Sequence, residues 1–469
     1  MANHHINSQH PVAVVIVPLP VQGHMNQLLN LSRLVSARNL PVYFLGTTAL
    51  ICQAKTRVHG WDPSSASMHF HEFPTPEFIN HPPNPYTSSK FPVHLVQPVM
   101  ATALNLRQPV YEFINNKLST EFNKIIVIYD FFMSYVVQDV GSVKNVEAYR
   151  FQCSSAFTSF SFHWKNQNEP PVPPEAIEVL NECPPEESSS APEFSDMIMQ
   201  LNTPINFSGD IYDACRVVEP LYIELIEKRK LLGAQQIWAL GPLNHISLPV
   251  NPDTGTRHDC LKWLDKHEPD SVILISFGTT VTFTDEEIKE IGLGLEKSHQ
   301  KFIWVLRDAD RGDISTNAVR ETSDIFPFGF EDRIKEKGLI LTGWAPQLEI
   351  LAHNATGGFM SHCGWNSCSE SITMGVPIAT WPMHLDQPRN AVLITKGLKV
   401  GVEVVHWECR NEKVSSDIVE KAVRKLMASD EGEKIRKRAK ELAACVRESF
   451  MEGGIARKEF DSFIAHIMK

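Results

Sequence analysis

The segment 344–387 brings together aromatic, polar and small residues whose spacing suits a phosphorylated ligand. Trp344 offers an aromatic face for a flat base, and Gln347 can reach a base edge or a ribose. An apolar run over 357–360 predicts a short buried strand, and 369–374 predicts a helix. The small and polar residues between them expose backbone N–H groups beside the positive helix end, which suits a diphosphate.

Carboxylate and amide side chains complete this segment. Glu370 lies one turn into the predicted helix, where it can accept ribose hydroxyls, and Asp386 and Gln387 can bind sugar hydroxyls. Each feature also has a simpler interpretation. Ser367 followed by Glu370 is a capping box, and a single tryptophan such as Trp365 is more often a core aromatic. The joint spacing, rather than any one residue, favours a nucleotide-sugar site.

The whole segment resembles the signature of plant secondary-product glycosyltransferases, which use UDP-sugars. The resemblance implies that the first Trp stacks on uracil and that the Glu takes the ribose hydroxyls. It also implies that the His, Asn and Ser hold the phosphates, while the second Trp and the final Asp-Gln pair bind the sugar. A terminal Gln accompanies glucose donors, with xylose as a neighbouring preference. The residues expected to bind UDP-glucose or UDP-xylose are Gly278, Thr279, Thr280, Trp344, Ala345, Gln347, His362, Gly364, Trp365, Asn366, Ser367, Glu370, Asp386 and Gln387.

The chain falls into two halves that each alternate apolar runs with helical patterns. The runs 12–17 and 125–128 are apolar enough for buried parallel strands, and 271–277 begins a second such pattern. Strands alternating with helices predict doubly wound α/β sheets. Thr279 and Thr280 follow the 271–277 strand, at the edge where ligands bind in such sheets.

The resemblance implies the GT-B fold, in which two Rossmann-like doubly wound domains face each other across a cleft. The C-terminal domain then holds most of the UDP-sugar, and the N-terminal domain holds most of the acceptor. The expected organisation is an acceptor-binding domain over 1–245, a linker over 246–258, a UDP-sugar-binding domain over 259–448, and a final helix over 449–469 that returns to the first domain.

Composition and charge narrow the classes of partner. A chain of 469 residues is long for one core, so two domains are expected. The net charge of −11 argues against nucleic acid, and the basic cluster 434–440 predicts a solvated helix face. Nine cysteines without a C-x-x-C pair suit reduced thiols. The start lacks a signal-peptide pattern and the 12–17 run is too short to span a bilayer, so we expect a cytoplasmic monomer without an integral membrane segment.

A base that removes the acceptor proton is expected from the N-terminal half. His24 follows the first strand and opens the first helix, whose positive end disfavours imidazolium. Asp130 ends a strand at the same sheet edge and can fix the imidazole tautomer. A histidine at a helix start is often structural, and an aspartate after a strand is often a helix cap. The resemblance places the family's catalytic His and its partner Asp at these two positions.

These residues predict an inverting O-glycosyltransferase that works in a single displacement. His24 takes the acceptor proton, and the preorganised groups around the helix end stabilise the leaving phosphate. We expect no metal and no cofactor, since the UDP-sugar is a co-substrate. The D-x-D at 308–310 matches a cation-binding spacing of another glycosyltransferase class, but its flanking arginines predict a solvated loop.

The acceptor is expected to be a small hydroxylated metabolite. The stretches 17–27, 128–130, 305–313 and 382–387 resemble the zeatin O-glucosyltransferase and O-xylosyltransferase subgroup, whose acceptor is a cytokinin side-chain hydroxyl. Flavonoid, phenolic and terpenoid alcohols are the alternatives within the same chemistry. The residues predicted to line an apolar acceptor pocket are 19–25, 49–56, Phe131, Phe132, Phe157, Phe160 and Phe162.

Two functions of other classes fit parts of the pattern. An NAD-dependent oxidoreductase also has α/β halves, but the first strand runs into prolines instead of G-x-G-x-x-G. A non-catalytic UDP-sugar sensor would keep the signature and dispense with His24 and Asp130. Both residues are present, which favours an enzyme.

Overall fold

The computed structural model describes most of the chain, and everything below concerns those residues. They are 12–56, 67–79, 81–86, 90–164, 171–230, 233, 236–244, 257–307, 309 and 325–469. Both aspartates of the D-x-D at 308–310 and most of the predicted linker 246–258 lie outside them.

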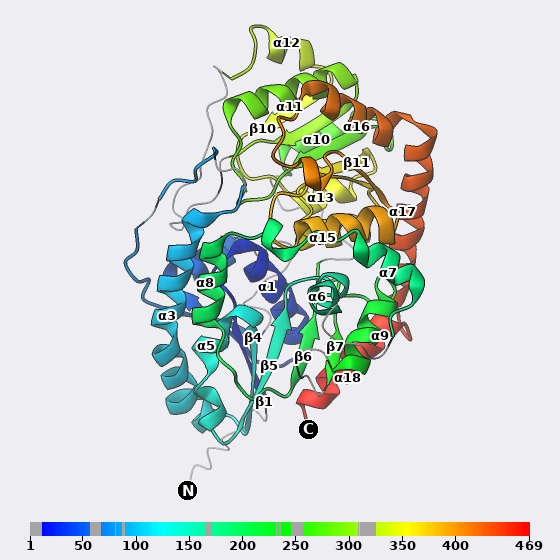
Figure 1. Ribbon diagram of the computed structural model, residues 1–469. Helices are drawn as coiled ribbons and strands as arrows, with labels where there is room; N and C mark the ends of the chain where they lie inside the picture. The colour runs from blue at the N-terminus through cyan, green and yellow to red at the C-terminus, as the bar shows by residue number, and fades with distance from the viewer. Residues whose placement is uncertain are drawn as a thin grey trace, which may run out of the picture.

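Two parallel sheets form the centre of the molecule, one above the other in Figure 1. The first has the strand order β3-β2-β1-β4-β5-β6-β7, and the second has the order β10-β9-β8-β11-β12-β13. The first sheet contains β1 (Val12–Val17), β2 (Val42–Thr47), β3 (Met68–Phe73), β4 (Lys124–Asp130), β5 (Val146–Gln152), β6 (Gly209–Tyr212) and β7 (Ile237–Ala239). The second contains β8 (Val272–Ser276), β9 (Lys301–Val305), β10 (Gly338–Leu341), β11 (Thr356–Ser361), β12 (Ile378–Thr380) and β13 (Gly401–Glu403).

Helices cover both faces of each sheet, as the alternating pattern predicts. Those of the first half are α1 (Gln22–Ser36), α2 (Thr48–Thr56), α3 (Val96–Phe113), α4 (Ser119–Glu121), α5 (Ser134–Val137), α6 (Ala156–His163), α7 (Pro174–Asn181), α8 (Pro192–Leu201) and α9 (Pro220–Arg229). Those of the second half are α10 (Asp259–Leu264), α11 (Asp285–Ser298), α12 (Phe330–Ile334), α13 (Gln347–Ala352), α14 (Trp365–Met374), α15 (Gln387–Val392), α16 (Ser416–Ala428), α17 (Asp430–Ser449) and α18 (Ile455–Ile467).

Each sheet reverses its strand order once, and both reversals bear on function. In the first sheet β1 lies between β2 and β4, with Val14 opposite Val42 on one side and Ile126 on the other. In the second sheet β8 lies between β9 and β11, with Leu274 opposite Phe359. A crevice forms at such a reversal because the following loops part to opposite faces, and ligands of α/β sheets bind there.

The last helix returns to the first sheet. Helices α17 and α18 run from the upper to the lower half of Figure 1. Phe463 and Ile467 of α18 are fully buried in the same core as β1 and β4. The Glu459 carboxylate pairs with Arg216 and accepts a 2.9 Å hydrogen bond from the backbone N–H of Ala239.

Contacts between the halves are polar as well as apolar. Asn390 of α15 accepts a 2.8 Å hydrogen bond from the Thr158 hydroxyl of α6 and donates a 3.0 Å bond to the Cys363 carbonyl. The Arg389 guanidinium donates to the Pro184 carbonyl at 3.0 Å. The segment after α7 therefore contacts the second half of the chain.

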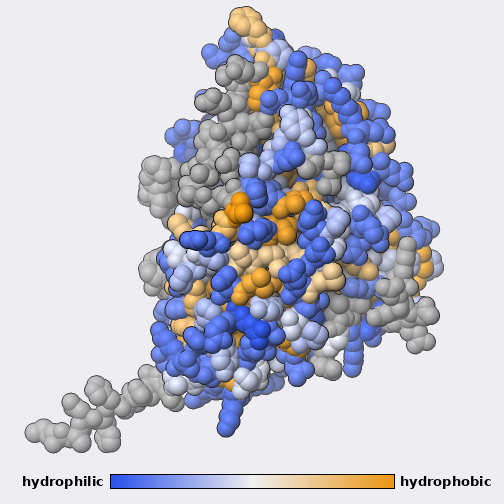
Figure 2. All heavy atoms as spheres, turned by 60° about the vertical axis from the view of Figure 1, so that its left-hand side comes forward, coloured by the Kyte–Doolittle hydropathy of each residue, from blue (hydrophilic) through white to orange (hydrophobic). Residues whose placement is uncertain are grey.

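The surface agrees with the composition. Figure 2 shows a largely hydrophilic face, with hydrophobic residues gathered near its middle. The basic cluster 434–440 lies on α17, as the charge pattern predicts. All nine cysteines are free thiols. Among the described helices, none combines the length and the apolar character that a membrane crossing needs.

Candidate active site

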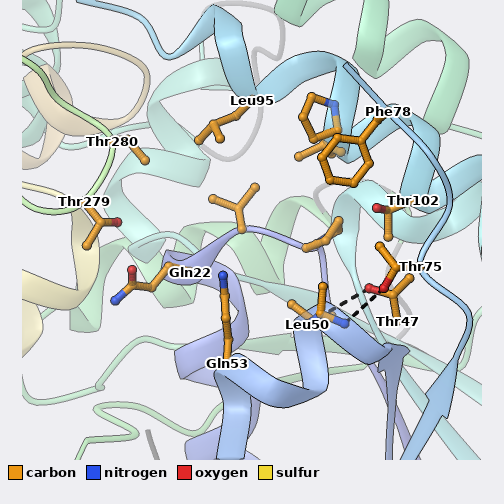
Figure 3. Close-up of a pocket in the computed structure, with 15 residues that line it drawn as sticks. Gln22, Thr47, Leu50, Gln53, Thr75, Phe78, Leu95, Thr102, Thr279 and Thr280 are labelled. Atoms are coloured by element: carbon orange, nitrogen blue, oxygen red, sulfur yellow. Dashed lines mark hydrogen bonds between the residues drawn. The ribbon is translucent and has the colours of Figure 1, made fainter. Parts of the chain in front are cut away.

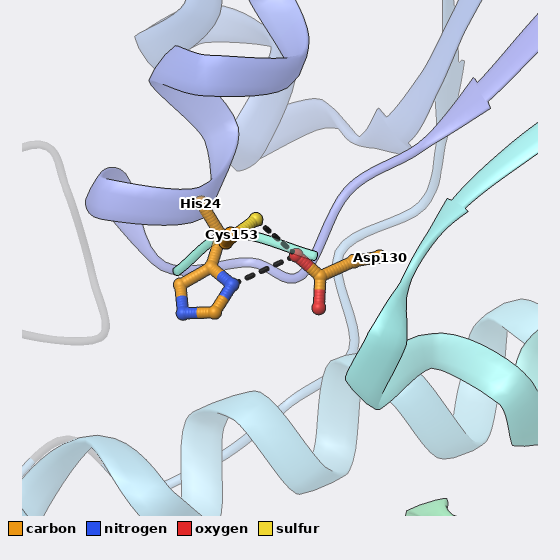
Figure 4. A group of neighbouring side chains, drawn as sticks. All are labelled: His24, Asp130 and Cys153. Carbon is orange, nitrogen blue, oxygen red and sulfur yellow. Dashed lines mark hydrogen bonds and ion pairs between the residues drawn. The ribbon is translucent and has the colours of Figure 1, made fainter. Parts of the chain in front are cut away.

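Three side chains meet where β1, β4 and β5 end, at the first reversal of strand order (Figure 4). His24, in the first turn of α1, lies with its Nδ1 atom 2.7 Å from Oδ2 of Asp130. The Asp130 side chain is fully buried, whereas 26% of the His24 side chain is exposed. Asp130 also accepts hydrogen bonds from the Phe132 backbone N–H at 3.0 Å and the Cys153 thiol at 3.0 Å. The structure therefore brings the two predicted catalytic residues into direct contact.

The tautomer of His24 follows from this contact. The buried carboxylate accepts a hydrogen bond from the N–H at Nδ1, so the neutral ring carries its free lone pair on Nε2. In Figure 4 that second nitrogen points away from Asp130. An imidazole held in this way can remove a proton from a hydroxyl group placed at Nε2.

The pKa of His24 shifts in the opposite direction to the one expected from the helix end. Burial lowers the pKa, but the charge and hydrogen bond of Asp130, with a smaller contribution from the charge of Asp386, raise it above the ordinary value of 6.5. A carboxylate at 2.7 Å acts more strongly on the ring than the partial charge of a helix terminus does. His24 is consequently a stronger base than a free imidazole.

His24, Asp130 and Cys153 also offer three potential metal-ligand atoms within 4.8 Å of one another. Burial, followed by the charge and hydrogen bond of Asp130, raises the pKa of the Cys153 thiol well above its ordinary value. A metal would require the thiolate and would remove the proton that His24 shares with Asp130. The protonated thiol fits better as a hydrogen-bond donor to the carboxylate.

The second reversal, between β8 and β11, forms the opposite wall of the site. His362 follows β11, and burial lowers its pKa to about 4, so the ring is neutral. A Cβ atom on Gly278 would lie 2.6 Å from Nε2 of His362, and Gly364 has the same restriction. Gly278 also has a φ of +75°, a conformation that favours glycine. These two glycines make room for the ring beside the loop after β8.

Helix α14 begins earlier than the sequence predicts. It starts at Trp365 rather than at 369, with Gly364 as its N-cap, so Asn366 and Ser367 lie in its first turn. Glycine caps a helix without a side-chain signal, which explains the error in the predicted start. The Asn366 amide donates a 2.8 Å hydrogen bond to the carbonyl of Gly23, the residue before His24.

Ser367 and Glu370 are not a capping box, because the helix begins before both of them. Gln347 instead donates to Oε2 of Glu370 at 2.9 Å and to Oγ of Ser367 at 3.2 Å. Burial raises the pKa of Glu370 to about 7 even though the Gln347 bond lowers it. A buried acceptor held next to an amide suits a diol such as that of ribose.

The two signature tryptophans differ in exposure. Trp344 is 49% exposed, and its ring centre lies 6.2 Å from that of His258. Ala345 beside it is half-buried. Trp365 is 6% exposed, and its indole N–H donates to the Asp213 carbonyl at 2.7 Å. The Trp365 indole therefore joins the two halves of the chain, and a contact of this residue with sugar would have to come from its backbone.

The final Asp-Gln pair is held by its own loop. Oε1 of Gln387 accepts from the backbone N–H groups of Met383 at 2.9 Å and His384 at 3.0 Å. Oδ2 of Asp386 accepts from the Asn390 amide at 2.7 Å. Burial raises the pKa of Asp386 above its ordinary value. These bonds fix both side chains before any sugar binds.

A pocket lies beside the start of α1 (Figure 3). Both segments that the sequence predicts to line an acceptor pocket, 19–25 and 49–56, contribute residues to it. Phe157 and Phe160 instead lie fully buried in the core, and Phe162 packs under the Arg389 guanidinium. Phe132 is near the site, with its ring centre 5.9 Å from that of His24. The lining residues are Pro20, Val21, Gln22, Thr47, Ala49, Leu50, Gln53, Thr75, Phe78, Leu95, Pro98, Val99, Thr102, Thr279 and Thr280.

Part of this lining was not predicted from the sequence. Phe78 follows β3, and Leu95, Pro98, Val99 and Thr102 come from the start of α3 and the turn before it. Their spacing carries no chemical motif, and only the folded topology places them beside α1 and α2.

Comparison with known proteins identifies the family. The model of the glycosyltransferase N-terminal domain matches residues 10–245, and the model of the UDP-glucoronosyl and UDP-glucosyl transferases matches residues 257–437. The zeatin O-glucosyltransferase of Phaseolus lunatus is 48% identical to this chain, over 98% of this chain and 97% of its own. This chain belongs to the UDP-glycosyltransferase family.

Two further relatives agree. The zeatin O-xylosyltransferase of Phaseolus vulgaris is 45% identical, over 99% of this chain and 100% of its own. The solved structure of Phytolacca americana UGT2 complexed with UDP-2fluoro-glucose and pterostilbene has a TM-score of 0.76 and 25% identity, covering 98% of this chain and 100% of the other. The expected GT-B fold is thereby confirmed, and this UDP-glycosyltransferase attaches sugar from a UDP-sugar to a small metabolite.

The His24–Asp130 contact predicts the pH dependence of the reaction. Activity should appear as pH rises through the raised pKa of His24, with a midpoint of kcat/KM above 6.5. In Asp130→Asn the neutral amide cannot offset the lowering of the His24 pKa by burial, so this midpoint should move to lower pH. The value of kcat should fall about a hundredfold to ten-thousandfold. Steady-state rates from pH 5 to 9 measure both effects.

Asp139→Asn is the matched control, because Asp139 is also paired with a cationic side chain and makes no contact with His24. Its partner is Arg107, and the N···O distance is 2.6 Å. The Asp139→Asn variant should keep the wild-type midpoint of kcat/KM against pH. A wild-type midpoint below 6.5, or an unchanged midpoint in Asp130→Asn, would contradict the assignment of His24 as the titrating base.

Proposed function

We propose that this protein transfers glucose or xylose from a UDP-sugar to the side-chain hydroxyl of a zeatin-type cytokinin, with inversion at the anomeric carbon. The observation that carries the reaction type is the 2.7 Å contact between the partly exposed His24 and the buried Asp130. An uncharged pocket lies beside the start of the same helix. The acceptor and the two sugars are supported by relatives at 48% and 45% identity, named for zeatin O-glucosylation and O-xylosylation.

The proposed reaction is a single displacement. Nε2 of His24 takes the proton of the acceptor hydroxyl while its oxygen attacks the anomeric carbon of the α-linked UDP-sugar. The bond from that carbon to the β-phosphate oxygen breaks, and UDP leaves with its electron pair. The products are a β-glycoside, UDP and a proton held by imidazolium, which Asp130 stabilises.

The proposed donor roles belong to residues at the second reversal of strand order, between β8 and β11. The first turn of α14, with His362, Asn366 and Ser367, is proposed to offset the charge on the leaving phosphate. Trp344 is proposed to stack on uracil, and Gln347 with Glu370 to hold the ribose. The other donor contacts are proposed for Gly278, Thr279, Thr280, Ala345, Gly364, Trp365, Asp386 and Gln387.

Two alternatives differ in their acceptor or in their chemistry. The same reaction on a flavonoid, phenolic or terpenoid alcohol needs no change in the base or the donor site. A UDP-sugar sensor needs the donor site alone, and a base paired with a buried carboxylate would then have no use. We further propose that the protein acts as a monomer and that it works in the cytoplasm, whose reducing conditions suit its nine free thiols.

An assay of UDP release tests the proposed function. The protein is incubated with UDP-glucose or UDP-xylose and with zeatin, a flavonoid, a simple phenol or a terpenoid alcohol. We expect UDP release in step with a β-glycoside of zeatin, the anomeric configuration being read from the proton coupling constant. Preferential turnover of another acceptor would replace the cytokinin assignment, an α-glycoside would refute inversion, and UDP-sugar binding without turnover of any acceptor would indicate a sensor.

We propose that the reaction needs no metal ion. The mechanism assigns the phosphate charge to helix α14 and neighbouring side chains, and the protonated Cys153 thiol makes a poor ligand. Dialysis against excess EDTA should leave kcat and KM for the UDP-sugar unchanged, with metal content followed by elemental analysis. Loss of activity that Mg²⁺ or Mn²⁺ restores would show that a cation takes part.

A further inference from the structure

Two glutamine side chains in the wall of the pocket lack protein partners (Figure 3). Gln22 opens α1, and its Oε1 atom is buried without a hydrogen bond. Gln53 lies on α2 with only 8% of its surface exposed. Within the described residues, no hydrogen bond joins either side-chain amide to another group. Buried polar atoms are normally paired, so the unpaired Oε1 of Gln22, next to the mostly buried Gln53 side chain, indicates a ligand that donates a hydrogen bond here.

The rest of the pocket limits the chemistry of that ligand. None of the residues that line it is charged, which favours a neutral molecule. Phe78, Leu95 and Val99 give it an apolar side suited to the face of a flat ring. The hydroxyls of Thr47 and Thr75 accept bonds from backbone N–H groups at 3.4 and 3.1 Å, and their O–H protons can still be donated to a ligand.

A carboxamide presents a donor beside an acceptor. The edge of an adenine ring presents the complementary pair, an N6–H donor beside the N7 acceptor, and glutamine binds this edge with two hydrogen bonds. An adenine substituted on N6 keeps one N6–H and its ring nitrogens. A simple phenol or terpenoid alcohol has no such edge and would leave the buried amides unpaired, which costs binding free energy.

We infer that Gln22 and Gln53 recognise the ring edge of an N6-substituted adenine and make this enzyme selective for acceptors that carry it. The inference rests on the proposed function and extends it to named specificity residues. Gln22 is two residues before His24 on α1, and Thr279 and Thr280 bring the loop after β8 to the same pocket. We propose that a ring held by these amides extends its hydroxylated side chain out of the pocket toward His24 and the donor residues.

Selectivity between two matched acceptors tests the inference. One acceptor is adenine with a hydroxylated alkenyl chain on N6, and the other is an aniline with the same chain and no ring nitrogens. The wild type should favour the adenine by about tenfold or more in kcat/KM, and Gln22→Leu and Gln53→Leu should each reduce that ratio by about tenfold. Gln108→Leu is the control, because Gln108 is exposed on α3 and bonded to Glu112 at 2.7 Å; it should keep the wild-type ratio.

The outcomes separate this inference from the proposed function. Binding of UDP, measured by calorimetry, shows that each variant is folded. An unchanged ratio in both pocket variants, or equal turnover of the two acceptors by the wild type, would overturn the inference while leaving the glycosyltransferase reaction intact.

Calorimetry also tests the inference if the wild-type protein glycosylates neither acceptor. Titration with the N6-substituted adenine would then decide the matter. Binding that Gln53→Leu weakens about tenfold would support the amide contacts although the proposed acceptor is wrong. No binding to the wild type would overturn both.

Discussion

The hydrogen bond between Nδ1 of His24 and the buried carboxylate of Asp130 determines what the cleft can do. It fixes the tautomer, turns the lone pair of Nε2 outward and raises the pKa of the ring. The bond exists because β1 and β4 are neighbours at the reversal of strand order, so the loops after them begin at the same edge. The Cys153 thiol, which follows the next strand, donates to the same carboxylate and holds it in place.

The donor half is fixed relative to this base by contacts that cross between the sheets. Asn366 bonds to the carbonyl of Gly23, which brings the first turn of α14 to the first turn of α1. The positive ends of the two helices thus lie close to each other, an arrangement that favours a negatively charged group near α14. Two buried hydrogen bonds, Trp365–Asp213 and Asn390–Thr158, also join the two halves of the chain.

Much of the fold could be predicted because buried parallel strands read as continuous apolar runs. The run 12–17 became β1 with those bounds, and 271–277 became β8 within one residue at each end. His24 and Asp130 could be paired from the order of the strands and from the resemblance. The donor signature was recognisable from its spacing, and the structure gathers its residues around α13, α14 and the loop before α15.

What the sequence could not predict depends on long-range packing. The start of α14 was missed because its glycine cap leaves no side-chain signal. The role of Cys153 beside Asp130 arises from the pairing of β4 with β5, and nothing in its local sequence marks it. Aromatic content alone could not separate Phe157, which is core, from Phe78, which lines the pocket. The pKa shift of His24 required the distance to Asp130, which no sequence pattern supplies.

The most direct measurement is the single-turnover rate of glycoside formation in His24→Ala, at a concentration of UDP-sugar that saturates the enzyme. The proposed base lies in the first half of the chain and the proposed donor residues lie in the second, so removing the imidazole should leave UDP-sugar affinity nearly unchanged. The rate should fall by about a hundredfold to ten-thousandfold, the usual contribution of a positioned general base. Glycoside formation at the wild-type rate would contradict the assignment of His24 as that base.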